Sequence, residues 1–138
     1  MELGRHDEKE GMIMQKDSVR DYITTAFRAY SALNCPDEYE IHKMNRKEAL
    51  KLDLLAVNKT IVQLSKNKQH HIIRAVEDVY FVEPLKKIRK NEIRNRVLAF
   101  ANQNYASERN VWYWLKQAIH ICAEYRGLNT SPLHEILD

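Results

Sequence analysis

The sequence has little of several residue types on which common folds and sites depend. It contains three glycines and three prolines in 138 residues, too few for the turns of a β-sandwich or barrel and for glycine-rich nucleotide-binding loops. Its two cysteines, Cys35 and Cys122, cannot form a disulfide framework and lack the spacing of metal ligands. No apolar run approaches the roughly 18–20 residues of a membrane-spanning helix, and the polar N-terminus does not have the pattern of a signal peptide. We therefore expect a soluble, cytoplasmic protein without a membrane partner.

What the chain does contain indicates a helical core. Hydrophobic residues make up 44% of the chain and charged residues 30%, which is enough apolar material for one packed domain. Apolar residues recur at helical spacing in five segments. These expected helices are 18–33, 46–66, 69–82, 90–103 and 108–126. The fold class predicted is all-α, a small helical bundle with a C-terminal helix-turn-helix.

The expected helices divide the chain into four parts. Residues 1–17 lack periodic apolar positions and are predicted to be a flexible arm, and residues 129–138 a tail. Between them lie an N-terminal helical part, 18–66, and a DNA-binding part, 67–128. Residues 35–45 are expected to be a connector, because Pro36 disfavours helical angles in the residue before it.

The second expected helix carries a coiled-coil pattern. Leu50, Leu54, Val57, Ile61 and Leu64 recur at alternating steps of four and three residues, as in a two-heptad seam. Such a seam can be buried inside a helical domain or at a homodimer interface. The pattern alone leaves both interpretations open.

Positive charge is concentrated late in the chain. Residues 84–126 carry nine basic and three acidic side chains, whereas residues 1–17 carry three basic and five acidic ones. A local positive field of this kind most often serves a phosphate backbone, although a solvated lysine-rich helix face gives the same pattern. Six basic side chains lie in or just before the fourth helix and are expected to hold flanking phosphates. They are Lys86, Lys87, Arg89, Lys90, Arg94 and Arg96.

Segments 90–103 and 108–126 together have the plan of a helix-turn-helix unit. Three residues join them, and Ser107 is a strong N-cap for the second helix. In such a unit the first turns of the second helix must be polar and must face outward, away from the apolar positions Val111, Leu115 and Ile119. Arg109 can donate to guanine edges, and Asn110 or Gln117 can read adenine. The full set expected at the DNA is Ser107, Glu108, Arg109, Asn110, Trp112, Tyr113, Lys116 and Gln117.

The stretch from Ala106 to Gly127, ASERNVWYWLKQAIHICAEYRG, resembles the recognition-helix segment of sigma factor region four. It is closer still to the phage and prophage transcriptional regulators of the ArpU and RinA types, and the resemblance covers roughly residues 70–127. By position, it implies base-edge and backbone contacts for Glu108, Arg109, Trp112 and Tyr113. The chain departs from the family in the turn, Gln103 to Ala106, which has no glycine.

These features predict a sequence-specific transcriptional regulator of phage or prophage origin that binds double-stranded DNA. One alternative is a phage DNA-packaging protein similar to a small terminase subunit. Another is a helical module that binds a protein, for instance RNA polymerase. No arrangement of nucleophile and base is recognisable, so we do not expect an enzyme. We also expect no cofactor and no metal site, because adjacent histidines such as His70 and His71 diverge on a helix.

Overall fold

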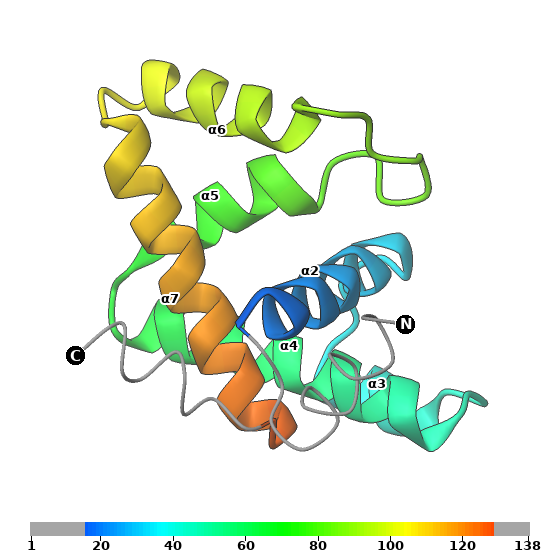
Figure 1. The fold of residues 1–138 in the computed structure, drawn as a ribbon. Coiled ribbons are helices and arrows are strands. Elements are labelled where there is room, and N and C mark those ends of the chain that lie inside the picture. The colour runs from blue at the N-terminus through cyan, green and yellow to red at the C-terminus, as the bar shows by residue number, and fades with distance from the viewer. Residues whose placement is uncertain (1–15, 129–138) are drawn as a thin grey trace.

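A computed structural model of the chain describes residues 16–128, which form a bundle of six α-helices (Figure 1). The helices are α2 Lys16–Ala32, α3 Glu38–Lys43, α4 Glu48–Lys66, α5 His70–Tyr80, α6 Glu92–Gln103 and α7 Glu108–Arg126. The expected all-α class is confirmed. No helix within residues 16–128 is long and apolar enough to cross a membrane.

The five helices expected from apolar periodicity correspond to α2 and to α4 through α7, with each end within two residues of its expected position. Most of the arm predicted at 1–17 and the whole tail predicted at 129–138 lie outside the described residues. The helix α2 begins at Lys16, inside the predicted arm.

The prediction of a plain connector at 35–45 is wrong, because this segment contains the short helix α3. A reciprocal capping box starts it: the Asp37 carboxylate accepts a hydrogen bond from the Glu40 backbone N–H at 2.8 Å, and the Glu40 carboxylate accepts one from the Asp37 N–H at 2.9 Å. Ile41 then buries its side chain in the core. The local capping contacts and this one buried residue stabilise a helix too short to show apolar periodicity.

The core is organised around α7, which packs against α4, α5, α6 and α2, most extensively against α4 (Figure 1). The two parts of the chain, 18–66 and 67–128, therefore share one buried core. The α4 seam lies in this core, where Leu54 and Val57 are completely buried within the single chain. Leu64 is buried as well, while Leu50 and Ile61 are partly buried against this core, so the packing within one chain favours the interpretation of the seam as an internal surface.

Several helices end in a left-handed residue although the sequence is poor in glycine. The residues that take this conformation just after α2, α4, α6 and α7 are Asn34, Lys68, Tyr105 and Gly127. At each end, the N–H of the following residue bonds back to a carbonyl five residues earlier, at 2.8–3.0 Å. This is the Schellman arrangement, which satisfies the last carbonyls of a helix. Only α7 uses the glycine that removes the steric cost of a positive φ.

Candidate nucleic-acid interface

The helices α6 and α7 meet at an open corner at one end of the bundle (Figure 1). Tyr105 turns the chain there with a φ of 54°, and the Ala106 N–H donates to the Ala101 carbonyl at 2.9 Å. The Tyr105 side chain is 99% exposed. The tight turn therefore forms without the glycine that the resembled family uses, and a tyrosine takes up the left-handed strain.

The start of α7 is defined by the cap expected from the sequence. The Ser107 hydroxyl accepts a hydrogen bond from the Asn110 backbone N–H at 3.1 Å, and Glu108 places a negative charge in the first turn. Both contacts stabilise a helix N-terminus, where unpaired N–H groups carry partial positive charge. The predicted cap at Ser107 and the glycine at the far end, Gly127, are confirmed.

The helix α7 has one apolar face and one polar face. Its apolar face is buried against the other helices by six residues, which are Val111, Leu115, Ala118, Ile119, Cys122 and Ala123. On the opposite side Arg109, Tyr113 and Lys116 are exposed and follow one another at steps of four and three, so they form a single stripe. Asn110 is exposed and Gln117 partly exposed beside it. The structure therefore brings five of the expected reading residues together on the outward face of α7.

Glu108 and Trp112 lie on a different side of α7. The Trp112 indole N–H donates to the Glu108 carboxylate at 3.1 Å, and Arg94 of α6 contacts the same oxygen at 3.2 Å. The indole lines a hollow of about 430 Å³ together with Arg28 of α2 and Tyr80 of α5. This pair therefore ties α7 to its neighbours, because both side chains are engaged within the chain and turned away from the outward stripe.

The second tryptophan, Trp114, lies on the opposite flank of α7, where it is partly buried. Its ring packs in a T-shaped arrangement with the ring of His71 from the first turn of α5, with 4.7 Å between the ring centres. His71 therefore takes part in packing. The two tryptophans contact neighbouring residues on the two flanks of α7.

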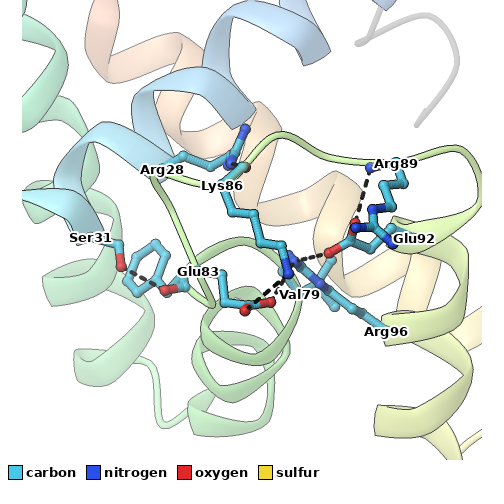
Figure 2. Close-up of polar contacts among 9 residues, drawn as sticks. Arg28, Ser31, Val79, Glu83, Lys86, Arg89, Glu92 and Arg96 are labelled. Carbon is cyan, nitrogen blue, oxygen red and sulfur yellow. Dashed lines mark hydrogen bonds and ion pairs between the residues drawn. The ribbon is translucent and has the colours of Figure 1, made fainter.

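Five of the six predicted phosphate contacts are exposed, and the sixth is a structural residue. Lys86, Lys87, Arg89 and Lys90 are exposed in the connection between α5 and α6, and Arg94 is exposed on α6. The side chain of Arg96 is only 13% exposed. It donates to the Val79 carbonyl at 2.8 Å and to the Glu92 carboxylate at 2.5 Å (Figure 2). Arg96 joins α6 to α5, so assigning it to a phosphate was wrong.

The basic connection, residues 81–91, which we call the α5–α6 loop, is fixed at both ends by other elements. Figure 2 shows Ser31 of α2 donating to the carbonyl of Phe81 at 2.7 Å, and Arg28 of α2 donating to the carbonyl of Lys86. At the far end the Arg89 N–H donates to Glu92 at 3.0 Å. No local pattern in the sequence points to Arg28 and Ser31, since their contacts with the loop span fifty or more residues.

Two acidic groups in this region, Glu92 and Glu108, accept hydrogen bonds from neighbouring donors. The Arg89 backbone N–H, followed by Arg96, lowers the pKa of Glu92. The Trp112 and Arg94 hydrogen bonds lower the pKa of Glu108. Both carboxylates are therefore charged at neutral pH and already bound to donors. Glu83 pairs with Lys86 at 3.7 Å and with Arg96 at 3.9 Å. The exposed cations in excess of these carboxylates set a positive local field, and they are Lys87, Arg89, Lys90 and Arg109.

Comparisons of the chain with models of protein families, with curated proteins and with solved structures gave no match.

Proposed function

We propose that the protein is a cytoplasmic, sequence-specific regulator of transcription that binds double-stranded DNA. In this proposal α7 lies in the major groove and α6 crosses the phosphate backbone beside it, as in helix-turn-helix proteins. The observation that supports it best is the division of α7 into a fully buried apolar face and an outward stripe of Arg109, Tyr113 and Lys116.

The outward stripe has the chemistry needed to read base edges. The guanidinium of Arg109 can donate two hydrogen bonds to the O6 and N7 of guanine, and the amides of Asn110 and Gln117 can pair with adenine. Tyr113 can contact a thymine methyl group or a phosphate. A helix bearing its side chains has the width of the major groove, so the whole stripe can enter it.

The basic side chains at the start of α6 supply the contacts that do not depend on sequence. Lys86, Lys87, Arg89, Lys90 and Arg94 lie at the opposite end of α6 from the turn. Contacts there would fix the position of the protein on the duplex without reading bases. Arg96, Glu108 and Trp112 are left out of this interface because their side chains are engaged inside the chain. Arg94 also bonds to Glu108, but it is kept because its side chain is 63% exposed.

The resemblance of residues 106–127 to sigma factor region four and to phage regulators supports a role in transcription, with RNA polymerase as a further partner. A homodimer formed through the α4 seam is not part of the proposal, since those residues are buried within one chain.

The test is selection of bound sites from random duplex DNA, followed by titration of variants on the selected site and on a scrambled duplex. Arg109→Ala should weaken binding to the selected site by about 1–3 kcal/mol and change binding to the scrambled duplex little. Arg46→Ala is the matched control, because Arg46 is an exposed arginine of the segment between α3 and α4. That segment lies far from the α6–α7 corner (Figure 1). It should bind like the parent.

Three outcomes would contradict the proposal. If the parent shows no salt-dependent binding to DNA, the protein-interaction alternative replaces it. If Arg109→Ala binds the selected site as tightly as the parent does, α7 is not the reading helix. If the protein forms a large ring in solution, the packaging alternative is favoured over regulation.

A further inference from the structure

The α5–α6 loop presents an almost fully exposed leucine among basic residues. Leu85 is 88% exposed, and Val82 in the same loop is 41% exposed. Lys86 and Lys87 follow Leu85 directly, and Arg89 and Lys90 come next. An apolar side chain flanked by cations is the combination with which many proteins enter the minor groove, where the apolar group contacts or separates bases and the cations hold phosphates.

The backbone of the loop is held in place by hydrogen bonds to neighbouring helices. A side chain that inserts between nucleobases needs such a rigid support. Ser31 and Arg28 hold the carbonyls of Phe81 and Lys86 on the α2 side, and Glu92 holds the Arg89 N–H on the α6 side (Figure 2). Lys86 also pairs with Glu83 across the turn at 3.7 Å. These ties to two helices reduce the conformational entropy that the loop loses on binding.

The length of α6 matches the separation of the two grooves. Its 12 residues span about 18 Å at 1.5 Å per residue. One helical turn of DNA is about 34 Å, so a minor groove lies about 17 Å along the duplex from the centre of the neighbouring major groove. With α7 in the major groove and α6 crossing the backbone, as in the proposed function, α6 is long enough to bring a loop at its start to the adjacent minor groove.

We propose that the α5–α6 loop docks in the minor groove next to the major groove that α7 occupies, with Leu85 against the bases and the flanking lysines on the phosphates. This inference rests on the proposed function and extends it with a second contact of different chemistry. The minor groove distinguishes A·T from G·C pairs mainly by shape and one donor, so the loop would prefer A·T pairs about half a turn from the site read by α7.

Dimethyl sulfate footprinting reads both grooves in one experiment, because the reagent methylates guanine N7 in the major groove and adenine N3 in the minor groove. The duplex carries the selected site flanked by A·T pairs. The parent should protect guanine N7 within the site and adenine N3 about five base pairs away, half of the roughly 10 base pairs in a turn.

The decisive variant is Leu85→Gln, which removes the apolar tip and keeps the size and charge of the loop. It should lose the adenine N3 protection, keep the guanine N7 protection and bind about tenfold more weakly, the equivalent of part of a buried leucine side chain. Leu52→Gln on α4 is the matched control, because Leu52 is an exposed leucine of a different element. It should leave both protections unchanged, and circular dichroism checks that both variants fold.

The failures of the two proposals are distinguishable. Guanine N7 protection without adenine N3 protection, or adenine protection that survives Leu85→Gln, overturns the loop proposal and leaves the role of α7 intact. Absence of any protection by the parent overturns both. A footprint unaffected by Leu85→Gln, together with loss of binding to vesicles of anionic phospholipid, would assign the loop to a membrane surface instead.

Discussion

Arg126 in the last turn of α7 forms an ion pair with Asp53 of α4, with 2.5 Å between Nε and Oδ1. The two side chains are 20% and 18% exposed. Tyr22 of α2 donates its hydroxyl to the same oxygen at 2.8 Å. Burial, followed by the hydrogen bond to Asp53, raises the pKa of Tyr22. One carboxylate therefore joins three helices at the end of α7 opposite the candidate interface.

We predict that Asp53→Ala lowers the free energy of unfolding by about 2–3 kcal/mol, because it leaves the Arg126 charge and the Tyr22 hydroxyl partly buried without their acceptor. Urea unfolding measures the change. Asp78→Ala, at an exposed aspartate of α5, should stay within about 0.5 kcal/mol of the parent. Equal losses in the two variants would show that the three-helix contact does not stabilise the fold.

A second prediction concerns the α4 seam, which lies inside the chain. Leu54 is completely buried, so Leu54→Ala should cost about 3 kcal/mol of stability through lost burial and a cavity. The molecular mass in solution should remain that of the parent, as measured by light scattering. A fall in mass at a concentration where the variant is folded would instead return the seam to a subunit interface.

Local patterns predicted the parts of the structure that local contacts determine. The sequence predicted both ends of α7, with Ser107 as the N-cap and Gly127 after the last turn. These features were predictable because residues close together in the sequence determine a helix face and its caps. The outward stripe of Arg109 and Tyr113 follows from the same periodicity. The helix α3 was missed, although the spacing of Asp37 and Glu40 is that of a capping box.

The residues assigned wrongly are those whose partners come from other elements. In the sequence Arg96 and Lys90 are both members of one basic cluster. In the structure Arg96 is partly buried, because it donates hydrogen bonds to the Val79 carbonyl and the Glu92 carboxylate. The sequence did hold one indication of this pairing, because Glu92 lies four residues before Arg96, the spacing of an ion pair on a helix. Glu108 is likewise four residues before Trp112 and pairs with it. A count of basic residues in the sequence treats every arginine as exposed to solvent. In the folded chain some arginines, such as Arg96, are instead partly buried and bind groups on neighbouring helices.

The difference between internal and interface cations gives a third prediction. Arg96→Gln should lower the stability by about 2 kcal/mol through the lost charged hydrogen bonds and leave the salt dependence of DNA binding unchanged. Lys90→Gln should leave the stability unchanged and reduce the slope of log K against log salt by about one unit. Urea unfolding and anisotropy titrations at several salt concentrations measure both. The reverse pattern would place Arg96 at the phosphates and contradict its structural role.

The fourth prediction concerns the acid side of the stability profile. Hydrogen bonds from Trp112 and Arg94 lower the pKa of Glu108 in the folded chain. The unfolded chain therefore binds this proton more readily, so the resulting stabilisation is present above the ordinary glutamate pKa of about 4.3 and is lost as the pH falls through the lower folded value. As the pH falls through that range, the free energy of unfolding should decrease less in Glu108→Gln than in the parent. Glu77→Gln, at an exposed glutamate of α5, should follow the parent, and identical acid profiles for all three proteins would refute the prediction.

The last prediction tests the strain in the turn between α6 and α7. Tyr105 has a φ of 54° and an almost fully exposed side chain, so replacing it by glycine loses no packing. Glycine removes a left-handed cost of about 1–2 kcal/mol and adds about 0.4–1 kcal/mol of unfolded-state entropy, so Tyr105→Gly should stabilise the protein by about 0.5–1 kcal/mol. Ala99→Gly, at an exposed position inside α6, should instead destabilise it by about 1 kcal/mol. Thermal and urea unfolding measure both changes, and a loss of stability in Tyr105→Gly would mean that the tyrosine stabilises the corner by contacts outweighing its strain.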